Sequence, residues 1–153
     1  MSKLLKFLLF LSLILFCTAC SSSEEKKTTK VIVPEKITFL FVTQPSCPSC
    51  DQLEATMELE KPRKLLSKYF NITKVYLGEK LPDGLIKPNG TPTVYFLGSD
   101  NDILVEPMIG EKKEKHLIEF LEDALLEFKK TYKVDLIEKV KNQQIKENNE
   151  TTV

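Results

Sequence analysis

A long apolar stretch that ends just before a pair of cysteines limits most strongly what this chain can fold into. Residues 37–43 are almost continuously apolar, β-branched or aromatic, which is typical of a central strand buried on both faces, as in parallel α/β sheets. Gln-Pro-Ser at 44–46 ends the stretch, and a helix is predicted to begin at Cys47 and Cys50. The pattern therefore predicts an α/β protein with both cysteines at the amino end of a helix.

The rest of the chain predicts a mixed sheet. The further predicted elements are a helix from Pro62, strands at 72–77, 93–97 and 103–109, an amphipathic helix at 112–131 and a weaker helix at 133–146. Residues 78–91 are predicted to form a loop, and the turn at 98–102 should join the last two strands as an antiparallel hairpin. Because a strand–helix–strand connection implies parallel pairing, we expect a mixed four-stranded sheet flanked by helices.

The amino terminus has the pattern of a targeting segment. Lys3 and Lys6 precede an apolar run at 7–16, which is about ten residues long and short for a spanning helix of roughly 20. Small residues lead to Cys20, and a polar stretch follows it. This pattern resembles a bacterial lipoprotein signal, which implies cleavage after residue 19 and a lipid on Cys20.

Cys17 is a departure from that pattern, because lipoprotein signals usually carry leucine at its position. A plain secretory signal and an uncleaved anchor therefore stand as alternatives to lipidation of Cys20. All three interpretations export the rest of the chain. Lipidation would hold it at the periplasmic face of a bacterial membrane.

Composition divides the chain into a signal peptide and three further parts. These are a signal peptide at 1–19, a flexible polar tether at 20–34, a folded domain at 35–131 and a weakly helical or disordered tail at 132–153. The charges balance, with 22 Lys and Arg against 22 Asp and Glu, which argues against nucleic acid as a partner. The single histidine, His116, excludes a multi-histidine metal site.

Counting the four cysteines narrows the chemistry. Cys17 would leave with the signal and Cys20 would be acylated, so Cys47 and Cys50 are the thiols of the mature chain. Structural zinc and iron–sulfur clusters need about four ligands, and covalent haem attachment needs histidine where Asp51 stands. A structural disulfide and inert thiols stay open, although so short a disulfide loop constrains little chain. A redox-active dithiol without metal or dissociable cofactor is the favoured interpretation.

The spacing of this pair suits thiol–disulfide exchange. Residues three apart share one face of a helix, and the positive end of the helix dipole favours a thiolate at Cys47. Pro48 suits the first helical position, where its missing N–H costs nothing. Cys47 is therefore predicted to be the attacking nucleophile, and Cys50, one turn further along, to be the shielded resolving thiol.

A second motif makes a family resemblance specific. Thr91 and Pro92 open an apolar strand after the cysteine-bearing unit, and a hairpin, Gly110 and a final amphipathic helix follow in order. With these features residues 35–131 resemble the thioredoxin superfamily. The resemblance implies a thioredoxin-like fold, in which Pro92 is a cis-proline beside the cysteine pair and the backbone of Thr91 pairs with an incoming substrate strand.

The chain also departs from thioredoxin itself. Ser46 stands in place of the tryptophan before the first cysteine, Pro48 and Ser49 replace Gly-Pro, and Phe41 occupies the position of a buried aspartate. The usual amino-terminal strand and helix are missing or reduced to residues 31–33. Proline directly after the first cysteine is similar to glutaredoxins and exported disulfide oxidases.

The combined prediction is a membrane-tethered thiol–disulfide oxidoreductase that exchanges disulfides with protein substrates, with reduction favoured over oxidation. Its partners would be protein thiols or disulfides and a membrane or periplasmic redox partner. The alternative is a non-enzymatic binding or chaperone module that has kept the fold. Asp51, Lys74 and His116 are predicted to be surface residues.

Overall fold

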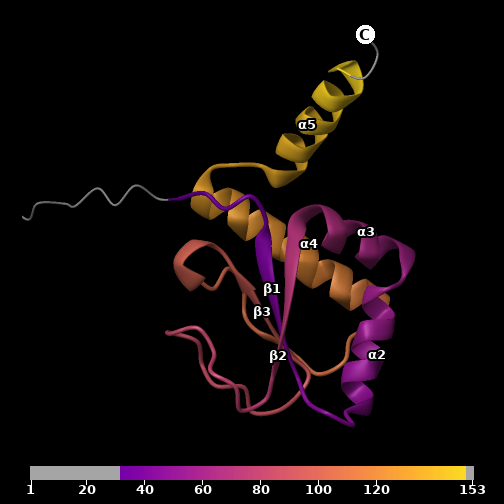
Figure 1. The fold of residues 1–153 in the computed structure, drawn as a ribbon, viewed down its shortest axis with the longest axis vertical. Helices are drawn as coiled ribbons and strands as arrows, with labels where there is room; N and C mark the ends of the chain where they lie inside the picture. Colours follow the sequence, from indigo (N-terminus) through magenta and orange to yellow (C-terminus); the bar gives the residue numbers. More distant parts are fainter. Residues whose placement is uncertain (1–31, 151–153) are drawn as a thin grey trace, which may run out of the picture. The chain divides into compact units, whose positions relative to one another are not determined.

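A four-stranded sheet forms the centre of the computed structural model, which describes residues 32–150 (Figure 1). The strands are β1 (Ile37–Thr43), β2 (Phe70–Tyr76), β3 (Thr93–Leu97) and β4 (Met108–Ile109). They lie in the order β2-β1-β3-β4, with β1 parallel to β2 and β3 antiparallel to both β1 and β4. The predicted mixed four-stranded sheet is confirmed.

Strand β1 lies between β2 and β3 because its side chains are apolar on both faces. Every residue of β1 is buried except the half-buried Thr38. Phe39 and Phe41 pack toward the helices, whereas Leu40 and Val42 pack on the opposite face of the sheet. The strand has the predicted bounds, and its carboxyl end leads into the loop that carries Cys47.

The helices are α2 (Pro48–Met57), α3 (Glu60–Tyr69), α4 (Glu114–Tyr132) and α5 (Leu136–Glu150). Helix α2 begins at the cysteine pair as predicted, and α4 follows the predicted amphipathic segment within two residues at each end. Helix α5 starts and ends further along the chain than the predicted weaker helix. Strand β2 begins at Phe70, directly after α3 and ahead of its predicted start.

The prediction that α3 starts at Pro62 is wrong, because the helix begins at Glu60. Pro62 lies in the first turn, where a backbone N–H has no partner inside the helix and its loss costs little. The N–H of Arg63 donates to the carbonyl of Leu59 at 2.9 Å, immediately after the proline. Lys61 is therefore helical, although it precedes a proline.

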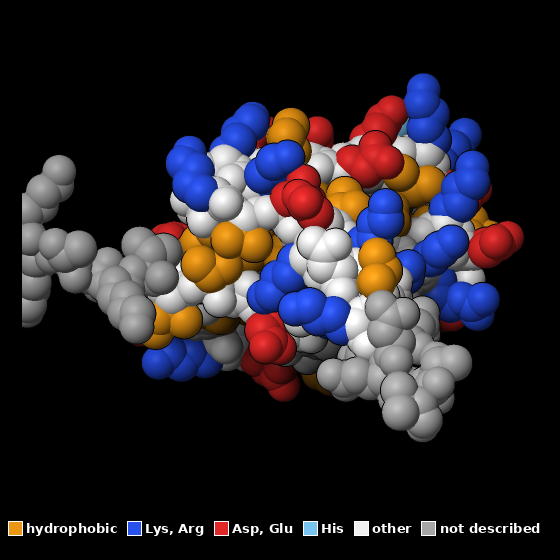
Figure 2. All heavy atoms as spheres, turned by 90° about the horizontal axis from the view of Figure 1, so that it is seen from above, with side chains coloured by type: hydrophobic (Ala, Val, Ile, Leu, Met, Phe, Trp, Pro, Cys, Tyr) orange, Lys and Arg blue, Asp and Glu red, His pale blue; other side chains and the backbone are white. Residues whose placement is uncertain are grey.

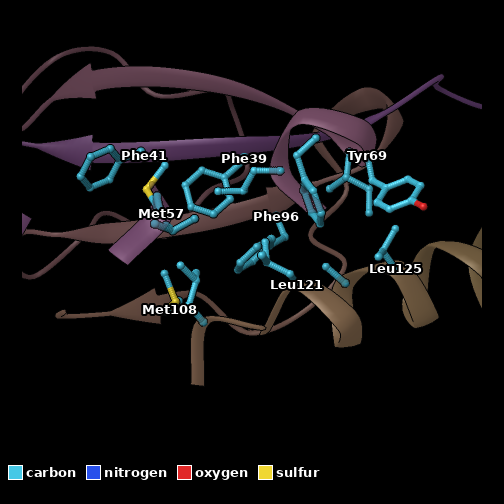
Figure 3. Close-up of a cluster of buried hydrophobic side chains, with 14 of the residues drawn as sticks. Phe39, Phe41, Met57, Tyr69, Phe96, Met108, Leu121 and Leu125 are labelled. Carbon is cyan, nitrogen blue, oxygen red and sulfur yellow. The ribbon is translucent and has the colours of Figure 1, made fainter. Parts of the chain in front are cut away.

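The main core lies between the sheet and the helices that follow β1 and β4 (Figure 3). Phe39 and Phe96 meet edge to face with ring centroids 5.4 Å apart, and Phe70 lies 6.4 Å from Phe39 in the same manner. Helix α4 contributes its buried stripe, which is Leu117, Leu121, Ala124, Leu125, Phe128 and Tyr132. Because Cys47 and Cys50 belong to this same cluster, the packing fixes the position of the cysteine pair.

The other face of the sheet is covered by the loop between β2 and β3. Leu40 and Tyr95 form part of a small buried cluster there, against which Leu81 and Leu85 of the loop pack. The hydroxyl of Tyr95 donates a hydrogen bond to the carbonyl of Ile86 at 2.5 Å, and burial raises the pKa of Tyr95. The loop predicted at 78–91 is confirmed, since no helix or strand forms between β2 and β3.

The strand predicted at 103–109 is wrong over most of its length. A short 3-10 turn at Ser99–Asn101 follows β3, and Ile103 makes an isolated bridge to Leu97. Regular pairing resumes only in β4, which has two residues. The register explains the interruption: Leu97 faces Ile103 and Val94 faces Met108, so the four residues 104–107 stand opposite only two residues of β3 and the extra ones leave the regular pairing. The predicted antiparallel direction of the hairpin is confirmed.

The chain beyond α4 stays attached to the core. Lys133 has left-handed backbone (φ +57°), which ends α4 and turns the chain. The carboxylate of Asp135 accepts hydrogen bonds from the N–H groups of Ile137 (3.0 Å) and Glu138 (3.2 Å), so it caps α5. Leu136 is then buried in the main core.

The surface carries charges of both signs. On the face shown in Figure 2, acidic and basic side chains are interspersed among small apolar areas. This arrangement agrees with the balanced composition of the chain. Within residues 32–150, no helix is long and apolar enough to cross a bilayer.

Candidate functional site

Cys47 and Cys50 form a disulfide at the amino end of α2, with their Cα atoms 5.2 Å apart. Cys47 is the N-cap residue, and its carbonyl accepts hydrogen bonds from the N–H groups of Cys50 (2.9 Å) and Asp51 (3.1 Å). The N–H of Cys50 also lies 3.2 Å from the Sγ atom of Cys47. The sulfur of Cys47 therefore occupies the place of a capping oxygen, where a backbone N–H and the helix dipole favour negative charge.

The two cysteines differ in depth. Cys47 has 6% of its surface exposed and Cys50 has 1%. Pro48 and Asp51 beside them are exposed, whereas Leu53 one turn further is buried. A partner that approaches the start of α2 would thus meet Cys47 before Cys50.

The loop between β1 and α2 places Cys47 at the amino end of the helix. The carbonyl of Thr43, the last residue of β1, accepts a hydrogen bond from the N–H of Leu77 at 2.8 Å. Ser46 then adopts left-handed backbone with φ +54°, which is unusual for a residue with a side chain. Pro48 takes the first helical position, where its fixed φ suits the turn.

The peptide bond between Thr91 and Pro92 is cis, as the resemblance implies. Pro92 is buried, and its carbonyl accepts a hydrogen bond from the N–H of Gly110 at 2.8 Å. Gly110 has φ +76°, a conformation that glycine adopts without steric cost. The Oγ1 atom of Thr91 lies 3.5 Å from the Sγ atom of Cys47. The fold thus brings the predicted Thr91–Pro92 element against the cysteine pair.

The backbone of Thr91 faces no strand of the sheet. Pairing of β3 with its neighbours begins only at Thr93, whose hydroxyl donates to the carbonyl of Gly90 at 2.8 Å. In the described part of the chain, no backbone–backbone hydrogen bond involves the N–H or carbonyl of Thr91.

An ion pair joins Lys74 of β2 to Glu54 of α2. The Nζ atom of Lys74 lies 2.6 Å from Oε1 of Glu54 and 5.6 Å from the ring centroid of Phe41. The hydrogen bond to Glu54 raises the pKa of Lys74 above its ordinary value. The register of β1 and β2 places Lys74 opposite Phe41, so the ammonium lies near the Phe41 ring as well as near Glu54. The exposed position predicted for Lys74 is confirmed.

The other predicted residues lie as follows. Asp51 and His116 are exposed, as predicted. Cys20 lies outside the described residues. Between residues 32 and 150, no group of His, Cys, Asp or Glu side chains is arranged to hold a metal ion. The sequence did not predict the contact of the Thr91 hydroxyl with Cys47, because the motif pointed only to the backbone of Thr91. The position of Thr91 directly before Pro92 was the one available signal.

Comparisons with known proteins give the following matches. No family model matches the chain, and no curated protein matches it in sequence. The reduced periplasmic thioredoxin SoxS from Paracoccus pantotrophus is 18% identical, with a TM-score of 0.46 over 58% of this chain and 99% of that one. A disulphide isomerase from Xylella fastidiosa Temecula1 is 19% identical, with a TM-score of 0.46 over 57% and 77%. The oxidised C-terminal domain of DsbD from Neisseria meningitidis is 24% identical, with a TM-score of 0.44 over 60% and 82%.

The bonded cysteine pair shows which chemistry is available, and the order of the elements shows the fold class. A pair of bonded sulfurs can alternate between a disulfide and two thiols, which moves two electrons and two protons. The mixed sheet, the cysteine pair at the start of α2 and the cis bond before Pro92 stand in the order that the resemblance implies. The described residues therefore have the thioredoxin-like fold, with Cys47 and Cys50 at the amino end of α2.

Proposed function

We propose that this chain is a thiol–disulfide oxidoreductase that acts on protein substrates. The observation that carries the proposal is the position of the Cys47 sulfur. It caps α2, bonds to Cys50 and lies against Thr91. A sulfur in that place is stabilised as a thiolate and still belongs to the more exposed of the two cysteines.

The first step in the reducing direction is attack by the Cys47 thiolate on a substrate disulfide. A bond forms between Sγ of Cys47 and one substrate sulfur, the substrate S–S bond breaks, and the other substrate sulfur leaves as a thiolate that takes up a proton. The product is a mixed disulfide between enzyme and substrate. In the disulfide form, the N–H of Cys50 lies 3.2 Å and the hydroxyl oxygen of Thr91 lies 3.5 Å from the sulfur that would attack.

The second step releases the substrate. The Cys50 thiol loses its proton and attacks Sγ of Cys47, so the mixed disulfide breaks and the second substrate sulfur leaves as a thiol. Cys47 and Cys50 end as the disulfide seen in the structure, and the substrate has gained two electrons and two protons. A partner dithiol at the membrane or in the periplasm would restore the reduced pair.

The substrate would lie along Thr91 and Pro92. An extended segment can donate to the carbonyl of Thr91 and accept from its N–H, which would hold the substrate disulfide beside Cys47. Because these contacts use backbone groups, they tolerate many side chains. Selection among protein partners would then depend on the surface around the site.

The amino-terminal pattern supports export and a lipid on Cys20. We expect the Cys20→Ala variant to lose the mobility shift and the membrane partition of the wild-type chain on a gel and after fractionation. Unchanged processing and unchanged membrane partition in that variant would reject the lipid anchor without touching the redox proposal.

An insulin-reduction assay tests the redox function against the binding or chaperone alternative. We expect Cys47→Ser to abolish activity, and Cys50→Ser to trap a mixed disulfide that a non-reducing gel resolves. Ser49→Ala is the matched control, since it lies between the cysteines and keeps both thiols. Activity that survives Cys47→Ser would remove the nucleophile assignment, and a phenotype that survives it would favour the binding module.

The direction of electron flow is a separate measurement. If the protein reduces substrates, the reduction potential of the Cys47–Cys50 pair should lie nearer to thioredoxin at about −270 mV than to DsbA at about −120 mV. A potential near the second value would make it an oxidant.

A further inference from the structure

Helix α3 (Glu60–Tyr69) concentrates positive charge on one side of the domain. Its ten residues hold one acidic side chain, that of Glu60, and four basic ones, which are Lys61, Arg63, Lys64 and Lys68. Helix α2, which precedes it, has two acidic side chains and no basic one. Among the described residues, none of the four cations of α3 takes part in a salt bridge. The helix therefore presents a basic face to the surroundings of the domain.

A groove between α3 and α4 borders this basic face. It has a volume of about 260 Å³, and the lysines on one face of α3 line it, which are Lys61, Lys64 and Lys68. The half-buried Leu65 and Ile118 also line the groove, together with one acidic residue, Glu122 of α4. Ammonium groups beside apolar side chains suit a charged headgroup that is joined to an acyl chain.

The last turn of α3 lies at the end of the sheet where β1 begins (Figure 1). Ile37, the first residue of β1, pairs with Phe70, which directly follows α3. Nζ of Lys36 donates a hydrogen bond to the carbonyl of Ser67 in α3 at 2.7 Å. Because the predicted tether at 20–34 leads into Lys36 and β1, it joins the domain beside α3.

The cysteine pair lies at the opposite end of β1. The strand has seven residues, which at about 3.3 Å each span roughly 23 Å, and its carboxyl end leads to Cys47. Figure 1 shows the start of α2 and helix α3 toward opposite ends of the sheet. A surface that contacts α3 therefore leaves the cysteine pair accessible to a protein partner.

We propose that the basic face of α3 contacts a bilayer surface that carries anionic lipid headgroups. This inference depends on the proposed membrane attachment through Cys20, and it specifies which side of the domain faces the lipid. The side chains of Arg63, Lys64 and Lys68 would lie among the headgroup phosphates. Cys47 would then face away from the bilayer, toward protein partners.

The tether makes a weak attraction sufficient. A random coil of the length of residues 20–34 spans on the order of 20 Å, so the domain stays close to the bilayer and the effective concentration of lipid is high. Each lysine or arginine near an anionic surface favours the contact by roughly fivefold. Because lipid attachment and a basic patch reinforce each other, the basic face would hold the tethered domain in one orientation.

A single tryptophan tests which side of the domain touches the lipid, since the chain has none. Ser67→Trp places it on the exposed side of α3, and Gln52→Trp places it on the exposed side of α2 near the cysteine pair. Each full chain is purified from membranes and reconstituted into vesicles of phosphatidylglycerol and phosphatidylcholine. A nitroxide on the headgroup of some phosphatidylcholine quenches nearby tryptophan. We expect Ser67→Trp to lose fluorescence and Gln52→Trp to keep it.

Charge removal tests the cause of the contact. Lys64→Gln combined with Lys68→Gln, in the Ser67→Trp chain, should lower the equilibrium constant for contact by roughly tenfold or more and restore the fluorescence. Vesicles of phosphatidylcholine alone should restore it too, as should high salt, which screens the attraction. Lys80→Gln combined with Lys87→Gln is the matched control, because it removes two exposed lysines of the loop between β2 and β3. Quenching should persist in that control.

Equal quenching of Ser67→Trp and Gln52→Trp would overturn the proposal. Quenching of Ser67→Trp that persists in phosphatidylcholine alone, or after Lys64 and Lys68 are replaced, would overturn it as well. A basic face that serves an acidic protein instead would leave Ser67→Trp unquenched.

Flotation of the vesicles reports the attachment separately. A chain that does not float rejects the membrane attachment together with this proposal, whereas a chain that floats with Ser67→Trp unquenched rejects this proposal alone. The insulin-reduction assay contains no lipid, so the proposed redox function is judged independently of both.

Discussion

The hydroxyl oxygen of Thr91 lies 3.5 Å from the sulfur of Cys47, although the two residues are 44 positions apart in the sequence. Their proximity follows from the sheet order. Strand β3, which Thr91 precedes, pairs directly with β1, which leads into the loop before Cys47. The fold therefore places the Thr91 hydroxyl next to the candidate nucleophile Cys47.

Removing this hydroxyl should slow the chemistry at Cys47. Thr91→Val keeps the shape of the side chain and removes a donor to the thiolate. A hydrogen bond to a charged group contributes about 1.5–3 kcal/mol, and partial exposure of this one to water reduces that contribution. We therefore expect the Cys47 thiol of Thr91→Val to be alkylated roughly threefold to tenfold more slowly than that of wild type. The measurement is the alkylation rate of the reduced protein with iodoacetamide in mildly acidic buffer. Thr91→Ser keeps the hydroxyl and should be alkylated at the wild-type rate. Equal alkylation rates for Thr91→Val and wild type would show that the contact has no effect.

Much of the site could be predicted from sequence because local patterns determine it. The continuous apolar run of β1 required burial on both faces, and Pro48 after Cys47 marked the start of a helix. The resemblance around Thr91 and Pro92 supplied the cis bond, which no spacing argument would give.

The rest depends on contacts between distant parts of the chain. The strand after the turn at 98–102 is interrupted because its register with β3 changes between Ile103 and Met108, whereas the sequence of 103–109 has the pattern of one continuous strand. The pair of Lys74 with Glu54 follows from the packing of α2 over β2, and neither residue has a sequence neighbour that predicts the other. The same holds for the hydroxyl of Thr91.

Gly98 and Tyr132 make a tight contact that mutation should reveal. The hydroxyl of Tyr132 accepts a hydrogen bond from the N–H of Ser99 at 2.7 Å. A Cβ atom on Gly98 would overlap that hydroxyl and lie 2.9 Å from Cζ of the ring. We expect Gly98→Ala to destabilise the fold by about 1–3 kcal/mol and Tyr132→Phe by about 1–2 kcal/mol, measured by urea unfolding.

The double variant distinguishes this contact from two independent effects. With the hydroxyl absent, the worst overlap disappears, so Gly98→Ala should cost less in the Tyr132→Phe background than in wild type. The remaining approach to Cζ keeps part of the cost. Additive losses in the two backgrounds would contradict the assigned contact.

Lys133 offers a stabilising substitution. Its φ of +57° ends α4 in the left-handed region, where a side chain is disfavoured and glycine is not. We expect Lys133→Gly to raise the free energy of unfolding by about 1 kcal/mol. Lys130→Gly is the matched control inside α4 and should lower it by a similar amount, about 1 kcal/mol. A loss of stability in both variants would mean that the lysine at 133 has contacts that outweigh its backbone strain.

Because of the ion pair between Lys129 and Asp135, part of the free energy of unfolding should depend on pH in the acidic range. Nζ of Lys129 lies 2.8 Å from Oδ2 of Asp135. This hydrogen bond, followed by the one from the N–H of Glu138, lowers the pKa of Asp135 below its ordinary value of 3.8. A carboxyl whose pKa is lower in the folded state stabilises the fold above its unfolded pKa. That contribution is lost as the pH falls through the folded value.

Asp135→Asn isolates this contribution, because asparagine still caps a helix but carries no charge. At neutral pH the variant should be less stable than wild type, and the difference should shrink as the pH drops below about 4. Thermal unfolding of both proteins across that range is the measurement. Lys129→Gln removes the other partner, and combining the two changes gives a coupling that should be present at neutral pH and vanish in acid. A difference between Asp135→Asn and wild type that stays constant with pH would instead assign the effect to capping alone, since the N-cap hydrogen bonds from Ile137 and Glu138 need no ion pair.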